Sequence, residues 1–383
     1  MDSLSLYVHI PFCVRRCPYC AFYHVRPAFG DESAFLEALV SEIEQTLGAA
    51  AEPTRLQTVF FGGGTPSVLT VGSWSRIFDA LDPYLQSAAE VTCELNPEDV
   101  RDEMLTHFRS LGVNRISLGV QSMDAASQHL LGRCSPEANR GAIERVRRIF
   151  RNVSFDVLLG IPERDPHTLE RSLRELVGYG PQHLSVYCLE AGGDLDEQAA
   201  AFFKAVDSES VADEYLLSCD LLEGAGFRHY EVSNFALPGY ESAHNRCYWN
   251  GGEYLGLGPA AHSYRNGRRF HNPPSLSSYL ETAGLPPETR RMHDDPGPEG
   301  LEVERLMLGL RTDDGLEVET LHCPRGAIDA MLMDGLGAVD GGRLRLTDRG
   351  FLVLNEIVLK LLAGRPRTEL PCCREKNKGC CEQ

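Results

Sequence analysis

Three cysteines near the amino end have a spacing that suits a metal cluster. Cys13, Cys17 and Cys20 follow the pattern C-x3-C-x2-C in a loop directly after an apolar, strand-like run. Three thiolates can hold a [4Fe-4S] cluster and leave its fourth iron open to the amino and carboxylate groups of a small molecule. Reduction of that assembly can cleave a sulfonium C–S bond. The alternative is a structural zinc, with His9 or His24 as the fourth ligand.

A run of glycines ends the next strand-like segment. Residues 57–61 are apolar or β-branched in the main and lead into Gly62-Gly-Gly-Thr-Pro66. Glycines let the backbone approach a ligand closely, so that its N–H and C=O groups can bond an amino-acid head group. Such a run alone is a weak signal, because tight turns use it often. One βα unit after the cysteine loop, it favours the cluster over zinc.

Repeated βα units must position these loops. From Leu4 to about Asn234, short apolar runs alternate with amphipathic stretches, which is typical of a parallel sheet wrapped by helices. Phe35 to Leu47 has helical spacing behind Asp31 or Ser33 as the N-cap. The predicted strands are Leu4–Ile10, Leu56–Phe61, Val91–Leu95, Arg115–Val120, Phe155–Leu159 and Leu184–Leu189. Six such units predict an α/β fold, an incomplete parallel (β/α)6 barrel.

The composition and periodicity of the sequence change after the predicted barrel. We expect the barrel at residues 1–235 and an aromatic, Gly-rich connecting segment at 236–298. A smaller C-terminal α+β domain should occupy 299–370, because amphipathic and β-like stretches alternate there. Residues 371–383 form a cysteine-rich tail, in which Cys372, Cys373, Cys380 and Cys381 either bind a metal or haem or have no structural role.

Composition excludes several classes of protein. A formal net charge of -18 disfavours non-specific binding to nucleic acid or to an anionic membrane surface. The sequence has no apolar run long enough to span a bilayer and no signal-peptide pattern at its start. Thirteen cysteines without an export signal indicate a reducing compartment, so we expect a cytoplasmic protein.

Taken together, the motifs resemble the HemN/HemW branch of the radical-SAM proteins. The first matches are Tyr7-x-His-Ile-Pro-Phe-Cys13-x3-Cys-Pro-Tyr-Cys20, Phe61-Gly-Gly-Gly-Thr-Pro66 and Glu94-x-Asn-Pro97. Residues 230–236, 254–260 and 346–350 extend the resemblance over almost the whole chain. It implies a cluster on the three cysteines and S-adenosylmethionine beside it. The residues implied at the S-adenosylmethionine site are Tyr7, Tyr19, Gly63, Gly64, Thr65, Glu94, Gln121, Arg133 and Asp156.

These roles are chemically sensible, but each has a structural alternative. A carboxylate at a strand end can accept hydrogen bonds from ribose, and an arginine can bind the methionine carboxylate. Equally, Glu94 and Asp156 could cap helices, and Arg133 could be a solvated helix end. Two positions depart from the family pattern, because Ser135 stands where the family often has His and Arg164 where it often has Gln.

Two features favour the HemW side of this branch. The oxygen-independent coproporphyrinogen oxidases have a fourth cysteine two residues after the third, and here Ala21 and Phe22 follow Cys20. His244-Asn245-x-x-Tyr248-Trp249 resembles the HemW motif H-N-x-x-Y-W. An imidazole can ligate haem iron while Tyr and Trp faces pack on the macrocycle, so His244 is the expected ligand. Cys247, His262 and His271 are further candidates, and the motif could instead be a polar loop anchored to the core.

The resemblance therefore implies a haem chaperone that binds a [4Fe-4S] cluster, S-adenosylmethionine and haem. It would deliver haem to acceptor haemoproteins such as respiratory cytochromes, and a shared haem or tail cluster would favour a homodimer. The alternative is a radical-SAM enzyme acting on a porphyrin or porphyrinogen, as a coproporphyrinogen III oxidase or a C-methyltransferase. A zinc-stabilised binding protein remains the third possibility.

Overall fold

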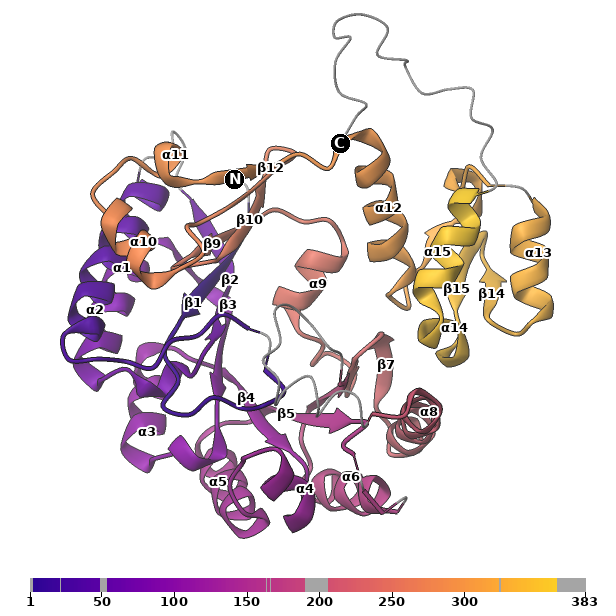
Figure 1. The fold of residues 1–383 in the computed structure, drawn as a ribbon, viewed down its shortest axis with the longest axis horizontal. Helices are drawn as coiled ribbons and strands as arrows, with labels where there is room; N and C mark the ends of the chain where they lie inside the picture. Colours follow the sequence, from indigo (N-terminus) through magenta and orange to yellow (C-terminus); the bar gives the residue numbers. More distant parts are fainter. Residues whose placement is uncertain are drawn as a thin grey trace, which may run out of the picture.

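Six parallel strands form the centre of the molecule and follow one another in chain order (Figure 1). The computed structural model describes residues 3–20, 22–48, 54–162, 164–165, 167–189, 206–323 and 325–363. The strands are β1 (Ser3–Ile10), β2 (Arg55–Gly63), β3 (Leu85–Leu95), β4 (Arg115–Gln121), β5 (Asn152–Leu159) and β6 (His183–Cys188). They confirm the predicted incomplete parallel (β/α)6 barrel.

Helices cover the outer face of these strands. They are α1 (Asp31–Gly48), α2 (Val71–Leu81), α3 (Asp102–Leu111), α4 (Ala125–Leu130), α5 (Pro136–Ile149), α6 (Thr168–Gly178) and α8 (Ser208–Gly224). Short 3-10 turns lie at Pro66–Val68, Asp82–Tyr84 and Pro97–Asp99. α1 begins at Asp31 and buries Phe35, Leu39 and Ile43 at helical spacing. The apolar stripe therefore packs α1 on the sheet, as its sequence predicts.

The sheet continues past both edges of the six strands. Beside β6 lie β8 (Asn234–Ala236) and β7 (Arg228–Glu231), both in antiparallel pairs. Beside β1 lies β9 (Tyr254–Leu257), which is parallel to it, followed by the antiparallel β10 (His262–Arg265), β11 (Arg268–His271) and β12 (Met292–Asp294). Residues 236–298, which show little periodicity, thus supply strands to the main sheet, together with helices α9 (Ala243–Trp249), α10 (Leu276–Thr282) and α11 (Pro287–Arg290).

A buried carboxylate fastens this segment to α1. Glu42 accepts hydrogen bonds from the backbone N–H of Gly258 at 2.9 Å, from Nδ2 of Asn272 at 2.8 Å and from the hydroxyl of Tyr279 at 2.7 Å. The guanidinium of Arg290 lies 3.4 Å from the same carboxylate. A buried charge is tolerated only when it is paired and hydrogen-bonded, and here all of its partners come from the added segment.

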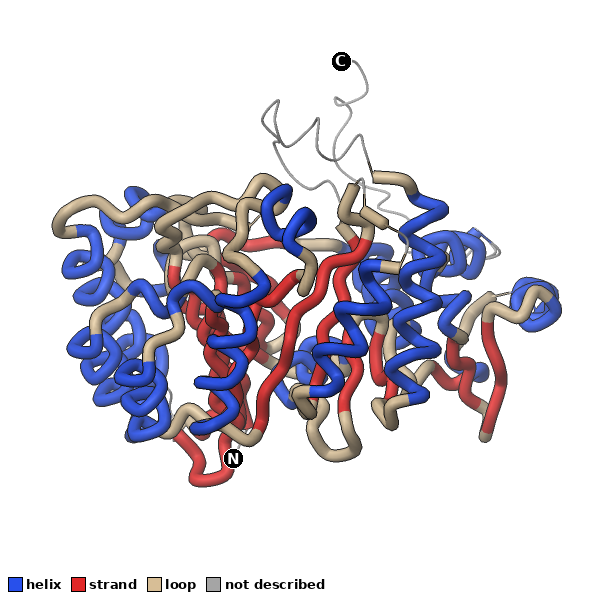
Figure 2. Tube along the Cα trace, turned by 90° about the horizontal axis from the view of Figure 1, so that it is seen from below, coloured by secondary structure: helices blue, strands red, loops and turns tan. Residues whose placement is uncertain are grey.

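A small α+β unit follows at the carboxyl end. It holds α12 (Gly297–Leu310), α13 (Arg325–Met333), α14 (Asp348–Leu352) and α15 (Leu354–Ala363), with a 3-10 turn at Val318–Thr320. Its sheet has the order β13 (Leu316–Glu317), β15 (Arg343–Leu346), β14 (Gly337–Asp340). Figure 2 shows this unit at the side of the barrel strands, and α12 packs near α9. This agrees with the predicted smaller C-terminal domain.

Among the described residues, we find no helix whose length and apolar character would let it cross a bilayer.

Candidate functional site

The cysteine loop folds back on itself after β1. The N–H of Cys13 donates to the carbonyl of Val25 at 2.9 Å, and the N–H of Val25 donates to the carbonyl of Pro11 at 2.7 Å. A turn then brings the N–H of Cys20 to 3.2 Å from the carbonyl oxygen of Cys17. None of the three cysteines is in a disulfide, and all three line a cavity of about 680 Å³. The loop therefore presents three thiols to one space, as a site-differentiated cluster requires.

The glycine run is tied directly to this loop. The N–H of Gly64 donates to the carbonyl of Ile10 at 2.8 Å, and that of Thr65 donates to the carbonyl of Phe12 at 2.7 Å. A Cβ on Gly64 would lie 2.7 Å from the carbonyl oxygen of Phe12, so no larger residue fits. Sγ of Cys13 lies 3.3 Å from Oγ1 of Thr65. The close backbone approach explains why glycine is needed at this position.

Two half-buried carboxyl groups lie on β3 and β5, the strands on either side of β4. Glu94 of β3 accepts a hydrogen bond from the N–H of Gly63 at 3.3 Å, and Asp156 of β5 accepts one from Oγ of Ser117 at 3.0 Å. Burial, followed by the charge of Asp156, raises the pKa of Glu94 to about 8. Burial also raises the pKa of Asp156 to about 6. Both groups line the first cavity, where a cationic ligand would stabilise their ionised forms.

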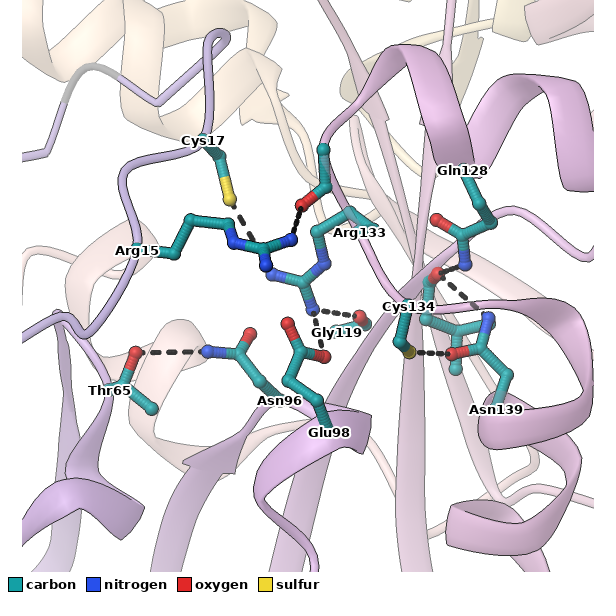
Figure 3. A network of polar contacts seen from close by, with 12 residues as sticks. Arg15, Cys17, Thr65, Asn96, Glu98, Gly119, Gln128, Arg133, Cys134 and Asn139 are labelled. Carbon is teal, nitrogen blue, oxygen red and sulfur yellow. Dashed lines mark hydrogen bonds and ion pairs between the residues drawn. The ribbon is translucent and has the colours of Figure 1, made fainter.

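An arginine crosses the cavity toward the cysteine loop (Figure 3). The guanidinium of Arg133 donates to the carbonyl of Gly119 at 2.7 Å, lies 3.6 Å from the carboxylate of Glu98 and lies 3.8 Å from Sγ of Cys17. Its side chain is 5% exposed, and its Nε has no hydrogen-bond partner. Gln121 has a positive φ of 68°, and its Oε1 is buried without a partner. Both side chains thus keep polar atoms available to a ligand.

A second cavity, of about 780 Å³, lies between the barrel and α12. Its lining includes Tyr7, His244, Asn245, Tyr248 and Trp249. From the C-terminal unit, Leu301, Glu304, Arg305 and Leu308 complete it. Phe22, Gly63, Glu94 and Tyr187 line both cavities. The two spaces therefore share a wall at the glycine run.

Comparison with known proteins identifies the family. The Radical SAM superfamily profile matches residues 7–176. The chain is 32% identical to the heme chaperone HemW of Lactococcus lactis, over 94% of this chain and 97% of that protein. The chain belongs to the HemW family of radical-SAM proteins. Further relatives are the heme chaperone HemW of Mycobacterium tuberculosis (35% identical, covering 94% and 95%) and the mitochondrial radical S-adenosyl methionine domain-containing protein 1 of Mus musculus (35%, covering 94% and 87%).

Among solved structures, coproporphyrinogen III oxidase (HemN) from Escherichia coli has the same fold. The TM-score is 0.80 at 22% sequence identity, and the superposition covers 94% of this chain and 90% of that one. At this identity the likeness concerns the fold alone. It supports the description of a radical-SAM barrel with a C-terminal unit for this member of the HemW family.

Most residues that the resemblance implies at the S-adenosylmethionine site lie together. Tyr19, Gly63, Gly64, Thr65, Glu94, Gln121, Arg133 and Asp156 all line the first cavity. Tyr7 does not, because it lines the second cavity, where its hydroxyl lies 3.0 Å from Nδ1 of His9. Neither Glu94 nor Asp156 caps a helix, since both lie within strands, and Arg133 is not a solvated helix end.

The structure changes the expectation for His244. Its Nδ1 lies 2.7 Å from Oγ1 of Thr58, and its Nε2 lies 2.7 Å from the hydroxyl oxygen of Tyr248. The ring is 1% exposed and stacks on Phe60 at a centroid distance of 5.1 Å. Burial lowers the pKa of His244 to about 3. As a buried, neutral imidazole with both nitrogens in hydrogen bonds, His244 has none left for an iron, contrary to the expectation from its motif.

His9, a candidate zinc ligand, has a partner at each ring nitrogen. Its Nδ1 lies 3.0 Å from the hydroxyl oxygen of Tyr7, and its Nε2 lies 3.0 Å from the carbonyl oxygen of Tyr23. Burial lowers the pKa of His9 to about 4, so the imidazole is neutral at physiological pH. His9 therefore has a structural role beside the cysteine loop and no free nitrogen for a metal.

The two departures from the family pattern have structural roles as well. Ser135 is the N-cap of α5 and accepts a hydrogen bond from the N–H of Ala138. Arg164 makes an ion pair with Glu214 at 2.5 Å, with its side chain 2% exposed. Neither residue therefore disturbs the cysteine loop. The cysteine-rich tail lies outside the described residues.

Sequence reasoning missed several residues that line the cavities. Asn96 belongs to the motif Glu94-x-Asn-Pro97 but had no role of its own there, and its Nδ2 donates to Oγ1 of Thr65 at 2.9 Å. Tyr187 lies at the end of β6 and lines both cavities. Arg269 comes from β11, and Leu301 and Leu308 come from α12. Strand-end position could have indicated Tyr187, whereas no local signal indicates residues that reach the site from α12.

Proposed function

We propose that this protein is a haem chaperone. It holds haem in the second cavity, next to a [4Fe-4S] cluster and S-adenosylmethionine in the first, and it passes haem to acceptor haemoproteins such as respiratory cytochromes. The observation that carries the proposal is the shared wall between the two cavities, in which Gly63 and Glu94 face both. Occupancy of the first cavity can therefore alter the second through direct contact.

The residues of the first cavity fit a cluster with a bound sulfonium ligand. Cys13, Cys17 and Cys20 would hold the cluster, which when reduced supplies the electron that cleaves the sulfonium C–S bond. Arg133 would bind the carboxylate of the methionine portion through its free Nε and neighbouring N–H groups. Glu94 and Asp156 would accept hydrogen bonds from the ribose, and the positive ligand would favour their ionised forms. Gln121 would direct its unpaired Oε1 to the amino group.

The lining of the second cavity suits a flat, apolar ligand that carries carboxylates. Aromatic rings from Phe60, Tyr248 and Tyr254 line it, and α12 adds Leu301 and Leu308. Two arginines of the lining could meet haem propionates. Arg269 is paired with Glu304, and Arg305 is paired with Glu302 at 2.7 Å. A propionate would have to replace one of these acidic partners.

We propose His262 as the axial ligand in place of His244. Three histidines line the second cavity among the described residues, namely His9, His244 and His262. The first two have partners at both ring nitrogens. The side chain of His262 is 64% exposed, and its Nδ1 lies 4.0 Å from the carboxylate of Asp294. Among the described residues, neither ring nitrogen of His262 is in a hydrogen bond, so the ring can present a nitrogen to iron, and the charge of Asp294 favours a cation there.

Anaerobic haem titration tests this function. The protein with a reconstituted cluster should gain a Soret band with haemin and should then transfer haem to an apo-cytochrome. In His262→Ala the band should shift and weaken by about tenfold in affinity, since a ligand bond is lost. Asp294→Asn leaves His262 in place, so it should lower the haem affinity by less than His262→Ala does. The control is His271→Ala, because His271 packs against the His262 ring at 4.9 Å but does not line the cavity.

The possible outcomes test haem binding and the identity of the axial ligand separately. Absence of any Soret change in the wild-type protein would contradict haem binding altogether. A wild-type band that His262→Ala leaves unchanged would contradict only the axial ligand. Turnover of coproporphyrinogen with release of 5'-deoxyadenosine would instead favour the enzymatic alternative.

A further inference from the structure

Three potential metal ligands meet where the barrel contacts the C-terminal unit, away from both cavities. Cys219 lies on α8, His229 on β7 and Asp348 at the first position of α14. Their ligand atoms all lie within 4.8 Å of one another. Nδ1 of His229 is 2.7 Å from Oδ1 of Asp348 and 3.8 Å from Sγ of Cys219. A thiol, an imidazole and a carboxylate therefore converge on one point.

The other side of the His229 ring limits how this cluster can be satisfied. Nε2 lies 3.3 Å from the carbonyl oxygen of Val232 and 3.4 Å from the hydroxyl oxygen of Tyr215, and that hydroxyl donates to the same carbonyl at 2.7 Å. A neutral imidazole carries one N–H. If that hydrogen is on Nδ1, the lone pair of Nε2 faces the carbonyl of Val232, and the nearest donor is the Tyr215 hydroxyl at 3.4 Å, which already donates to that carbonyl. If it is on Nε2, the lone pair of Nδ1 faces the carboxylate of Asp348. Neither neutral tautomer therefore gives both ring nitrogens a close, uncommitted partner of the complementary kind.

A cation at Nδ1 removes this conflict. The hydrogen then stays on Nε2 and is donated to Val232, which is the arrangement that metal-bound histidines usually show. The ring is held in place by stacking on Phe235 at a centroid distance of 4.1 Å and by an edge contact with Phe351. The ring orientation that a metal needs is therefore already present without one.

We propose that Cys219, His229 and Asp348 form a binding site for a divalent cation of the zinc class. The ligand set would be a thiolate, Nδ1 of the imidazole and a carboxylate, with water in the fourth tetrahedral position. The side chain of Asp348 is 30% exposed, which leaves a path for the ion and for that water. The thiolate and the carboxylate together balance the charge of the cation.

The surroundings favour a cation and define its proton balance. Burial, and then the carboxylate of Asp348, raises the pKa of the Cys219 thiol, and Glu223 and Asp220 act in the same direction. The thiol is therefore protonated without metal, and binding releases that proton to solvent as the metal–sulfur bond forms. The nearby carboxylates supply a negative potential that attracts the ion.

The location gives the site a structural consequence. His229 belongs to β7 at the edge of the main sheet, Cys219 belongs to the neighbouring helix α8, and Asp348 belongs to the unit that also contains α12. Because α12 lines the second cavity, a metal that joins α8, β7 and α14 would hold the C-terminal unit against the barrel. This inference does not depend on haem binding.

Metal analysis of the full chain tests the site. Protein with a reconstituted cluster is equilibrated with zinc, passed into metal-free buffer and assayed for zinc and iron. We expect about one zinc per chain in addition to the cluster iron. Asp348→Asn should retain the hydrogen bond to His229, because an amide oxygen also accepts, but should lower zinc affinity at least about tenfold. Cys219→Ser should lower the zinc affinity to a similar extent.

Matched variants exclude the remaining thiols. Cys247→Ser, at a half-buried cysteine outside the cluster loop, and serine replacement of all four tail cysteines should leave the retained zinc unchanged. As a second measurement, zinc should raise the melting temperature of the wild type but not of Asp348→Asn. A chain that retains no zinc would overturn the site. Zinc that survives in both ligand variants would overturn it equally.

Discussion

Nε2 of His244 lies 2.7 Å from the hydroxyl oxygen of Tyr248, one helical turn further along α9. Two residues of the motif that resembles a haem site thus hold each other, and Thr58 of β2 holds the opposite nitrogen. Trp249 is the last residue of α9, and the Cζ atom of Arg311 lies over its ring, 3.7 Å from the ring centroid. The motif therefore builds a rigid wall for the second cavity, and the exposed imidazole there is His262.

His244→Ala should therefore damage stability more than haem coordination. The change removes two buried hydrogen bonds and the stack on Phe60, at a cost of about 2–4 kcal/mol in the free energy of unfolding. Tyr248→Phe, which removes one of these hydrogen bonds, should cost about 1 kcal/mol. Urea unfolding measures both. The haem spectrum of folded His244→Ala should keep histidine ligation, and loss of that signature would reinstate His244 as the ligand.

Arg133 should tune the reduction potential of the cluster. Its guanidinium lies 3.8 Å from Sγ of Cys17, so it stabilises the additional negative charge of the reduced state. Arg133→Gln should lower the potential by about 40 mV, equivalent to about 1 kcal/mol for one electron. Redox titration followed by electron paramagnetic resonance measures it. Arg15→Gln is the control, because exposed Arg15 donates to the carbonyl of Gly132 and to no other group among the described residues. Equal shifts in both variants would contradict a specific role for Arg133.

Glu94 should make the stability of the cluster-free protein fall as pH rises. Its folded-state pKa of about 8 exceeds the ordinary value of 4.5, so the native state keeps a proton that the unfolded chain releases. The contribution of Glu94 to the free energy of unfolding is therefore largest below pH 4.5, decreases as the pH rises and is lost above about pH 8. Glu94→Gln should remove this decline and be more stable than the wild type at pH 8. Asp156→Asn should remove only the decrease in stability that Asp156 itself causes between pH 3.8 and about pH 6.

Urea unfolding at several pH values checks the sign. The wild-type free energy of unfolding should fall between pH 5 and pH 8 more steeply than that of Glu94→Gln. Parallel slopes for the two proteins would mean that Glu94 is ionised in the free cavity at neutral pH, and the interpretation of a neutral carboxyl would then fail.

Gly64→Ala should disrupt the cluster site. An added Cβ would lie 2.7 Å from the carbonyl oxygen of Phe12 and 2.8 Å from that of Ile10, which both belong to the backbone of the cysteine loop. We expect a loss of more than about 2 kcal/mol in stability and a large loss of bound iron after reconstitution. Gly72→Ala, with no atom within 4 Å of its added Cβ on α2, should be neutral or stabilise by about 0.5–1 kcal/mol. Equal iron content in both variants would show that the close approach is not needed.

Much of the fold follows from patterns that are local in the chain. The barrel strands are largely buried, and β4 shows the pattern clearly, because Ile116, Leu118 and Val120 alternate with Arg115, Ser117 and Gly119 on the opposite face of the strand. The cysteine spacing and the glycine run lie in short loops next to β1 and β2, so their roles depend on few residues. By contrast, residues 236–298 have weak periodicity because their strands are three or four residues long.

The sequence by itself determined the superfamily, the parallel barrel and the position of three thiols beside a glycine run. Only the tertiary structure decided that Tyr7 faces the second cavity, that His244 is bonded by Thr58 and Tyr248, and that His262 is exposed there. It also brought Asp348 to His229, 119 residues earlier in the chain. The physical reason is that a side chain can bind a ligand or metal only with atoms that its neighbours leave unbonded. Those neighbours belong to segments that are distant in the chain.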